Sequence, residues 1–296
     1  MDVSIIIVNY NTTGLVNQCI SSILKYCTNV VYEIIVIDNA SSDRSIEKIS
    51  SLWPSVKLIL NKNNNGFGSA NNQGIKVAKG EFYFLLNSDA YLVGDCLTPF
   101  LAFMKDPQNI DCAVCGAELF TGTSKTTVSF GNFPTITRVI ASLGGYMLFK
   151  SFYKKHMNLG VVNYDSQIKV VDFISGAAMF IRKSVIDVVG PFDEDFFLYF
   201  EETELSYRIR KAGYKSVILP HVKIIHLEGQ SQVVPDFNYD RYRNFAVSRN
   251  LYYVKAHGKL YALTAKFFHL VHAVIFTMLG KEDGKLSKKI KILIRS

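Results

Sequence analysis

The chain has 296 residues, of which 49% are hydrophobic and 20% are charged. This length suits one large domain or two modest ones, and the composition supports a sizeable core and argues against disorder. The 33 basic and 25 acidic residues give a formal net charge of +8, which suits a polyanionic ligand or an anionic membrane surface.

Cysteine usage and the first residues indicate the compartment. Five cysteines occur without a regular framework, which is typical of a reducing compartment. Cys112 and Cys115 form a CxxC without a second pair, and their apolar surroundings favour a buried strand over a zinc or redox site. The N-terminal residues MDVSIIIVNYN have no basic region and too short an apolar run for a signal peptide. We therefore expect a cytoplasmic protein.

Strand-like and helical patterns alternate through the first 120 residues. Apolar runs predict strands at residues 4–10, 32–37, 56–60, 82–86 and 112–119. Apolar residues at helical spacing predict intervening helices around residues 15–24, 46–49, 70–78 and 97–104. Ser41-Ser42-Asp43 resembles the cap of the second helix. This alternation predicts an α/β fold with a mostly parallel sheet and right-handed crossovers.

Polar residues follow four of the expected strands, at residues 9–11, 38–39, 65–68 and 87–89. Because the carboxyl ends of parallel strands meet at one edge of a sheet, these residues predict a ligand-binding rim. The sequence contains neither GxGxxG nor GxxxxGK[ST], which excludes a dinucleotide fingerprint and a P-loop. A phosphate-bearing ligand would therefore need a metal ion or other donors to hold its charge.

The rim segment Asn87-Ser88-Asp89 ends the buried run 82–86. Alone it would be interpreted as a turn, because Asn, Ser and Asp all favour turns. At the end of a buried strand, however, the Asp89 carboxylate must find a cation or hydrogen-bond donors.

The second half is less regular. Residues 121–168 have weak periodicity and suggest a variable insertion, such as a mobile lid or an acceptor loop. Small residues within 171–178 suit a floor that a ligand approaches closely. A helix expected over 201–211 begins with Glu201, Glu202 and Glu204 behind a dense aromatic cluster. These acids either complement the helix dipole or supply a partly desolvated general base.

The chain resembles glycosyltransferase family 2 over roughly residues 3–230. The resemblance rests on six segments in order: SIIIVNYN, IIVIDNASSD, NNNGFGSANNQG, FLLNSDA, FISGAAMFIRK and GPFDEDFFLYFEETELSYRIRKAGYK. Within the family it is most similar to bacterial rhamnosyl- and galactofuranosyl-type enzymes of surface polysaccharide assembly.

The resemblance implies a GT-A fold, a divalent metal (Mg²⁺ or Mn²⁺) and an inverting reaction. The implied donor is a nucleotide sugar, either a dTDP- or a UDP-sugar, with dTDP-rhamnose among the candidates. The implied acceptor is a glycan or a lipid-diphosphate-linked sugar in O-antigen or capsule assembly.

The same resemblance implies roles for individual residues. Glu202 matches the catalytic base, Asp38 matches the acid that reads a pyrimidine base, and Asp89 and His226 match metal-ligand positions. The implied donor-binding residues are Tyr10, Asn11, Asp38, Asn39, Asn65, Gly66, Phe67, Asn87, Asp89 and Gly176.

Two positions depart from the family pattern, because Asn87 replaces the first acid of the metal motif and Glu202 replaces an aspartate. Two alternatives stay open: a non-catalytic nucleotide-sugar-binding protein and a nucleotidyltransferase. The latter would usually show a glycine-rich basic loop near the N-terminus, and none is present.

The C-terminal part differs from the rest, so we expect a GT-A domain over 1–230 and a helical, basic region over 231–296. Residues 260–279 are strongly apolar and 281–295 mostly basic, which suits a helix at the surface of an anionic membrane. A packed appendage or a dimer interface is the alternative. We expect peripheral attachment to the inner face of the cytoplasmic membrane, no nucleic-acid partner, and an oligomeric state that the sequence leaves open.

Overall fold

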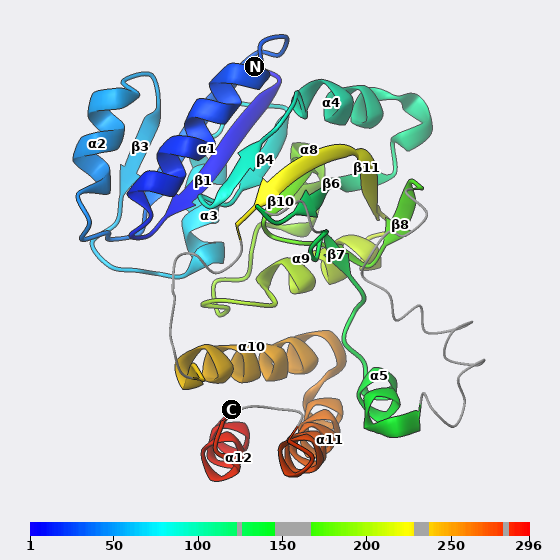
Figure 1. Cartoon of the computed structure of the whole chain (residues 1–296). Helices are drawn as coiled ribbons and strands as arrows, with labels where there is room; N and C mark the ends of the chain where they lie inside the picture. The colour runs from blue at the N-terminus through cyan, green and yellow to red at the C-terminus, as the bar shows by residue number, and fades with distance from the viewer. Residues whose placement is uncertain (123–125, 146–166, 228–236, 281–283) are drawn as a thin grey trace.

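The structure is a computed structural model that describes residues 1–122, 126–145, 167–227, 237–280 and 284–296. A central sheet carries helices on both faces, and three C-terminal helices lie below it in Figure 1. Much of the expected insertion at 121–168 lies outside the described residues, so its role as a lid or an acceptor loop stays a prediction.

The main sheet has nine described strands in the order β3-β2-β1-β4-β10-β6-β11-β5, with β8 also paired to β11. Their bounds are β1 Val3–Asn9, β2 Tyr32–Asp38, β3 Lys57–Leu60, β4 Phe82–Leu86, β5 Ala90–Leu92, β6 Cys112–Phe120, β8 Lys169–Val171, β10 Ala178–Arg182 and β11 Lys215–His226. The five strands expected in the first 120 residues are confirmed with small shifts at their ends.

Strands β1 to β4 are parallel neighbours, and this places the predicted rim at one edge. The register pairs Asn9 of β1 with Asp38 of β2, the last residue of each strand. β3 and β4 run in the same direction on either side of this pair. The segments that follow β1, β2 and β4 therefore leave the sheet together, as the sequence predicts.

Beyond β4 the sheet continues with β10, which the sequence pattern does not identify as a separate strand. β10 lies antiparallel between β4 and β6, and its Phe180 pairs with Phe84 and Cys115. β11 is parallel to β6 and antiparallel to β5 and β8. Cys115 and Cys112 are buried free thiols of β6, so the CxxC belongs to a core strand.

Helices cover the sheet on both faces and bury two apolar clusters. α1 (Thr13–Tyr26) and α4 (Leu97–Lys105) pack on one face, and α3 (Phe67–Val77), α8 (Lys183–Val189) and α9 (Glu201–Lys211) pack on the other. The remaining short elements are α2 Ser45–Leu52, η1 Pro107–Asn109, β7 Phe130–Gly131, α5 Ile136–Ile140, η2 Ala141–Gly145 and β9 Phe173–Ile174.

The expected cap of the second helix is wrong. α2 begins after Arg44, whose φ is 57° and whose own side chain makes no capping hydrogen bond. Asp43 instead accepts hydrogen bonds from the backbone N–H of Thr13 at 3.0 Å and from its hydroxyl at 2.5 Å. The carboxylate therefore pairs a backbone N–H group in the first turn of α1, whose N-cap residue makes no capping hydrogen bond of its own.

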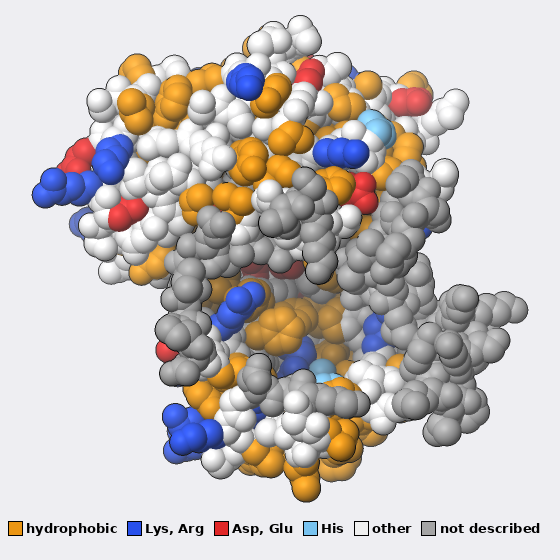
Figure 2. Space-filling model, viewed as in Figure 1, with side chains coloured by type: hydrophobic (Ala, Val, Ile, Leu, Met, Phe, Trp, Pro, Cys, Tyr) orange, Lys and Arg blue, Asp and Glu red, His pale blue; other side chains and the backbone are white. Residues whose placement is uncertain are grey.

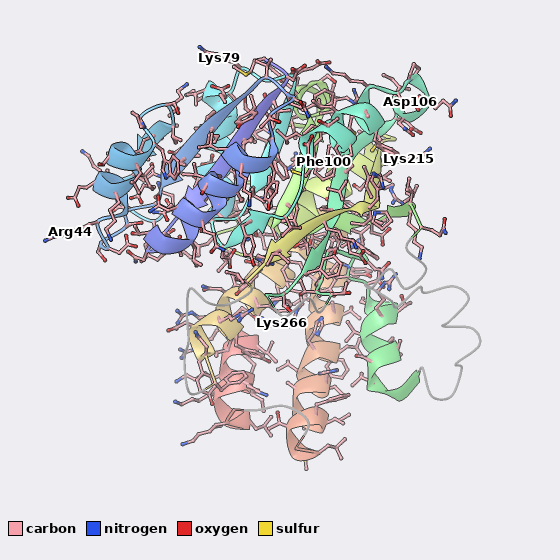
Figure 3. All side chains as sticks on the ribbon, turned by 45° about the horizontal axis from the view of Figure 1, so that its top comes forward. Arg44, Lys79, Phe100, Asp106, Lys215 and Lys266 are labelled. Carbon is pink, nitrogen blue, oxygen red and sulfur yellow. The ribbon has the colours of Figure 1, made fainter. Side chains whose placement is uncertain are left out.

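The C-terminal region forms α10 (Tyr239–His257), α11 (Lys259–Met278) and α12 (Leu286–Arg295). Tyr252 of α10 and Ala265 of α11 share a buried cluster with Phe196 and Phe200, which precede α9. The helices are thus packed on the sheet region, and Figure 2 shows a hollow between the two parts. In the turned view of Figure 3, α10, α11 and α12 lie together beyond the sheet.

α11 meets the length and composition of a membrane-crossing helix, with a mean hydropathy of 1.4, a test that core helices of soluble proteins also pass.

Candidate functional site

A cavity of about 580 Å³ lies at the carboxyl edge of β1, β2 and β4. The segment 197–199 and the start of α10 close it from the side of the C-terminal helices. It brings together seven of the ten predicted donor-binding residues: Tyr10, Asn11, Asn39, Gly66, Phe67, Asn87 and Asp89. Asp38, Asn65 and Gly176 adjoin these residues without lining the cavity.

Asp38 fixes the strand ends beneath the cavity. It is fully buried, and its Oδ1 accepts a hydrogen bond from Asn9 Nδ2 at 2.7 Å. Its Oδ2 accepts from the backbone N–H of Ser41 at 2.9 Å. The carboxylate therefore holds the loop after β2 in place, and its contact with a nucleotide base stays a prediction.

Asn39 organises the neighbouring polar loop. Its Nδ2 donates to Asn64 Oδ1 at 2.8 Å and to the carbonyl of Gly66 at 3.2 Å. Its Oδ1 accepts from Asn61 Nδ2 at 3.0 Å and from the backbone N–H of Asn65 at 3.3 Å. One buried amide thus uses both ends to hold the loop 61–66, which is why this loop can be long and polar yet ordered.

Gly66 allows this loop to touch the segment that closes the cavity. Its φ is 88°, and a Cβ atom at this position would lie 2.2 Å from the carbonyl oxygen of Phe197. The same oxygen accepts a hydrogen bond from the backbone N–H of Phe67 at 3.0 Å. No side chain larger than hydrogen fits here without moving the backbone.

The closing segment carries backbone strain. Tyr199 and Phe200 have φ values of 70° and 65°, a conformation that bulky residues rarely adopt. Each such residue costs of order 1–3 kcal/mol and persists only where surrounding contacts enforce it. The enforcing contacts here include Phe245 of α10, whose ring packs edge-on against both aromatic rings.

Asp89, which lines the cavity, lies against His226 at the end of β11. Ala90, next to Asp89, pairs with His226 across β5 and β11, which brings Asp89 Oδ1 within 3.2 Å of His226 Nε2. Both side chains are only 12–13% exposed. Asn87 Oδ1 is buried and has no hydrogen-bond partner among the described residues.

This donor set fits a hard divalent cation that shares its ligands with a phosphate. A carboxylate oxygen and an imidazole nitrogen converge there, with an amide oxygen in the same segment. The described part of the chain holds no group of three or more His, Cys, Asp or Glu side chains suited to a metal. An ion bound here would therefore need oxygen ligands from the substrate as well.

The three acids at the start of α9 have different surroundings. Glu204 accepts from Arg208 Nε with both oxygens, at 2.8 and 2.9 Å. Glu201 is buried and lies against Gly68 of α3, where a Cβ would be 3.6 Å from its own. Glu202 faces Gly176, where the corresponding distance is 3.9 Å. The three acids therefore have different neighbours, and the role of Glu202 as the base stays a prediction.

Glu202 is the acid beside the cavity. Gly176 also lies against the ring of Phe67, which lines the cavity, at 3.4 Å from the position of a Cβ. Oε2 of Glu202 has no hydrogen-bond partner in the described part of the chain. Burial raises the pKa of Glu202 to about 7, against the opposing effect of two backbone N–H groups. Burial and the neighbouring Glu202 also raise the pKa of Glu201 well above its usual range.

Asp193 and Asp195, the other acids near this helix, are held in an ion-pair cluster. Lys255 of α10 donates to Asp193 and, at 2.5 Å, to Asp195. Burial raises the pKa of Asp193, but the hydrogen bonds from Lys255 and the backbone N–H of Asp195, together with the charges of Lys255 and Arg208, outweigh it, and the net pKa is lowered. The Asp193 carboxylate is therefore not disposed to accept a proton near neutral pH.

Several cavity residues have no counterpart in the sequence prediction. From the first half, Thr12 and Asn64 line the cavity, and Asn238, Arg241 and Asn244 reach it from the C-terminal region. Arg241 lies over the ring of Tyr199, 5.9 Å from its centroid, and brings a cation to the cavity. The sequence signal for these residues was weak: basic residues among aromatics at the start of a helix.

A mostly parallel sheet with helices on both faces and a polar cavity at its carboxyl edge is the arrangement of the GT-A fold. The family model of glycosyl transferase family 2 matches residues 4–190. The chain therefore belongs to this family and is a glycosyltransferase, which confirms the resemblance.

Three similar proteins are named as glycosyltransferases. A low-salt glycan biosynthesis hexosyltransferase of Haloferax volcanii is 28% identical over 251 residues, 82% of this chain and 73% of that protein. A poly(ribitol-phosphate) beta-glucosyltransferase of Bacillus spizizenii is 30% identical over 37% of this chain and 18% of that protein. An N-acetylglucosaminyl-diphospho-decaprenol L-rhamnosyltransferase of Mycobacterium tuberculosis is 38% identical over 21% of this chain and 20% of that protein.

Solved structures confirm the predicted fold. GalNAc-T7 with UDP, GalNAc and Mn²⁺ superposes with a TM-score of 0.64 at 17% identity, covering 99% of this chain and 54% of that one. A mannosyltransferase of Pyrobaculum calidifontis with GDP-Man and Mn²⁺ gives 0.57 at 16% identity, covering 99% and 74%.

Proposed function

We propose that this glycosyltransferase moves a sugar from a nucleoside-diphosphate donor to an acceptor hydroxyl with inversion at the anomeric carbon. The observation that carries the proposal is the position of Glu202, a carboxylate with a raised pKa and a free oxygen, beside the cavity that also holds Asp89. Inversion needs one in-line attack, so one base and no covalent carboxylate nucleophile suffice.

The donor would lie along the rim at the ends of β1, β2 and β4. Asn11, Asn39 and the loop at Gly66 would position the nucleotide, and Asp89 with His226 would hold a divalent ion, Mg²⁺ or Mn²⁺. When bound, such an ion neutralises the charge of the departing diphosphate. Arg241 adds a cation at the opposite wall. A dTDP- or UDP-sugar, dTDP-rhamnose included, is the donor class we propose.

Glu202 acts on the other substrate. Its Oε2 would accept the proton of the acceptor hydroxyl while that oxygen attacks the anomeric carbon. Its raised pKa suits this step, because a general base works best when its pKa lies near the operating pH. The strained turn at Tyr199 and Phe200 orients the first turn of α9 and so fixes where this carboxylate points.

The acceptor we propose is a glycan or a lipid-linked sugar that carries phosphate, in surface polysaccharide assembly. Two relatives are named for phosphate-containing acceptors, a poly(ribitol-phosphate) and a diphospho-decaprenol. The basic balance of the chain suits such a polyanion.

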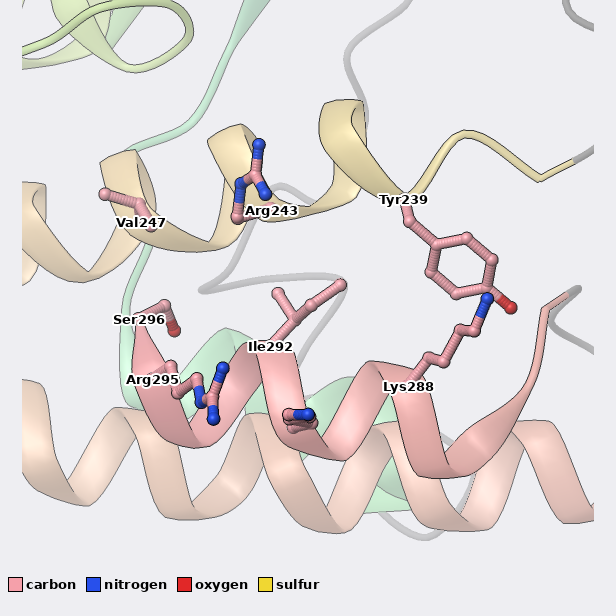
Figure 4. Close-up of a pocket in the computed structure, with 8 residues that line it drawn as sticks. Tyr239, Arg243, Val247, Lys288, Ile292, Arg295 and Ser296 are labelled. Carbon is pink, nitrogen blue, oxygen red and sulfur yellow. The ribbon is translucent and has the colours of Figure 1, made fainter.

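A membrane surface would supply a lipid-linked acceptor. Leu260, Leu263, Phe267 and Met278 share one face of α11 and are 61–80% exposed. A groove of about 290 Å³ between α10 and α12 is lined by Arg243, Lys288, Lys291 and Arg295 (Figure 4). Apolar side chains beside a cluster of cations are typical of a helix that lies on an anionic bilayer. We propose peripheral attachment to the inner face of the cytoplasmic membrane through these helices.

A panel of nucleotide sugars tests the donor assignment. Thermal unfolding is measured with dTDP-, UDP- and GDP-sugars, each with Mn²⁺, with Mg²⁺ and with EDTA. A donor present at 100 times its Kd stabilises the fold by about 2.7 kcal/mol, so the true donor should raise the Tm by several degrees and EDTA should remove the shift.

Transfer itself is measured as release of the nucleoside diphosphate. Donor binding without hydrolysis or transfer to any phosphate-bearing acceptor would favour a non-catalytic binding protein. Release of pyrophosphate from a nucleoside triphosphate would favour a nucleotidyltransferase. Full transfer in excess EDTA would overturn the metal assignment.

A further inference from the structure

A second chamber, distinct from the donor cavity, lies among α5, α10 and α11. Its volume is about 450 Å³, within the range of sites that hold small organic ligands. One side of the chamber is formed by the segment 132–142, and the rest by α10, α11 and the turn before α9. None of its residues lines the donor cavity, although Phe200 and Phe245 belong to the wall between the two.

The chamber is lined by cations and aromatic rings. Arg138 of α5 and Arg249 of α10 contribute guanidinium groups, and His269 and His272 of α11 contribute imidazoles. None of the described residues that line it carries a carboxylate. The charge of Asp172 acts on Arg138, but this carboxylate also binds Arg210 and the backbone N–H of Phe133.

Burial and the positive charge of this lining lower the pKa of the His269 imidazole. Burial, the charge of Arg249 and the neighbouring His272 lower the pKa of His269 to about 3. His269 is therefore neutral, and its Nε2 lies 3.3 Å from the hydroxyl of Tyr253. The permanent positive charge of the chamber rests on the two arginines, because guanidinium groups stay protonated even when partly buried.

The chamber lies next to the catalytic helix. The rings of Tyr199 and Phe200 separate it from the donor cavity: Tyr199 lines the cavity and Phe200 lines the chamber. Phe245 packs against both rings, with centroid distances of 5.7 and 5.0 Å. Glu202 follows two residues after Phe200. Because Phe200 directly precedes α9, a ligand anchored in the chamber would lie at the start of the helix that carries the proposed base.

We propose that this chamber binds the phosphate or diphosphate group of the acceptor and so places the acceptor sugar beside Glu202. The inference rests on the proposed function, since it assigns the second substrate of that reaction. Two guanidinium groups can take phosphate oxygens in pairs, and the rings of Tyr242 and Phe245 offer faces to an attached sugar or alkyl group.

Binding of two probes by calorimetry, in EDTA and at moderate salt, tests the proposal. Inorganic diphosphate represents a water-soluble phosphate group, and farnesyl diphosphate represents a lipid-borne one. Arg138→Gln and Arg249→Gln should each weaken diphosphate binding about tenfold or more, the usual range for a hydrogen bond to a charged group.

Arg44→Gln is the matched control. Arg44 is an exposed arginine at the far edge of the sheet (Figure 3), and its replacement should change the Kd less than twofold. Binding by the outer groove of α10 and α12 would persist equally in all variants. If Arg249→Gln fails to fold, the test uses Arg138→Gln together with Arg249→Lys, which keeps the charge.

The outcomes distinguish a lipid-linked acceptor from a soluble one, and both from the absence of a phosphate site. Tighter binding of farnesyl diphosphate supports a lipid-linked acceptor, and binding of inorganic diphosphate alone supports a soluble phosphorylated glycan. No binding to the wild-type protein, or equal binding by wild type and both glutamine variants, overturns the proposal. The measurement contains neither nucleotide sugar nor metal, so its result is independent of the donor assignment.

Discussion

At the scale of single residues, the choice between Glu201 and Glu202 decides the mechanism. Glu202→Gln should lower kcat by roughly 10²–10⁴-fold, the usual contribution of a general base, and leave the donor Kd nearly unchanged. The reason is that Glu202 faces Gly176 beside the cavity, whereas Glu201 faces α3. Transfer kinetics and donor titration of both glutamine variants make the comparison. An inactive Glu201→Gln beside a fully active Glu202→Gln would reverse the assignment.

The raised pKa of Glu202 makes a separate prediction about pH. A base must be deprotonated, so the transfer rate of the wild type should rise with pH through about 7. Stability should change in the opposite sense, because the folded state holds this proton more tightly than the unfolded chain, whose value is near 4.5. Glu202→Gln should therefore raise the Tm at pH above 7 and have little effect below 4.5. An equal shift at both pH values would show that burial of the charge is not the cause.

Gly66 illustrates how one backbone position supports the donor site. Gly66→Ala would place a methyl group against the carbonyl of Phe197 and force a side chain into φ 88°. We expect a loss of ~1–3 kcal/mol of stability together with weaker donor binding, measured by denaturant unfolding and by the nucleotide-sugar panel. Gly94→Ala is the control, because a Cβ there meets nothing within 4 Å. Wild-type donor affinity in Gly66→Ala would show that this loop does not shape the site.

At the scale of elements, the parallel half of the sheet and its rim could be predicted because the signal is local. Each strand from β1 to β4 is a continuous apolar run followed by polar residues, and short crossovers fix their common direction. β10 could not be placed, because its insertion between β4 and β6 depends on pairings with residues more than 60 positions away. Asp43 was misassigned for the same reason: its partner, Thr13, is 30 residues distant.

The sequence also predicted part of the candidate site, namely seven residues that line the cavity. Rim residues follow from strand ends, whereas the role of Glu202 rests on its match to the family position and stays a prediction. Arg241, Asn238 and Asn244 could not be assigned, because the packing of α10 across the cavity arises from tertiary contacts that leave no periodic pattern. The boundary at residue 230 stays a prediction, and the cavity draws residues from both of its sides.

Lys255 links two elements, and its replacement tests that link. The lysine joins α10 to the segment between α8 and α9 through Asp193 and Asp195. Lys255→Met should cost ~1 kcal/mol or less, as is typical of partly exposed ion pairs. The loss should disappear at low pH, because the lowered pKa of Asp193 means that its contribution is present at neutral pH and is lost as the carboxylate protonates. Denaturant unfolding of both proteins at neutral and acidic pH measures it. A pH-independent difference would assign the effect to packing on Phe196, over whose ring Lys255 also lies.

At the scale of the whole molecule, the C-terminal helices pack against the segment before α9 and are also a candidate membrane contact. Ala262 and Ala265 of α11 pack in the cluster of Phe196 and Phe200. Removal of residues from Leu260 onward should therefore lower the Tm and weaken donor binding, since this cluster supports the strained turn before α9. Unfolding and donor titration of the truncated chain make the test. An unchanged Tm and donor affinity would show that α11 is an independent appendage.

Membrane attachment needs variants that leave this packing intact. Leu263 and Phe267 are 65% and 61% exposed, so replacing both by glutamine should preserve the fold. Burial of such a side chain in a bilayer is worth ~1.5–3 kcal/mol, so the double variant should lose sedimentation with phosphatidylglycerol vesicles by well over tenfold. Lys288→Gln and Lys291→Gln should each lower binding about fivefold, since a cation near an anionic surface contributes ~1 kcal/mol. Leu52→Gln, at an exposed position of α2, is the control.

Rising salt should weaken the contribution of the lysines to vesicle binding and leave that of the apolar face unchanged, because only the charge interaction is screened. If the double variant sediments as the wild type does at every salt concentration, the exposed face of α11 contacts protein rather than lipid, and a second copy of the chain becomes the partner to seek by measuring the solution mass.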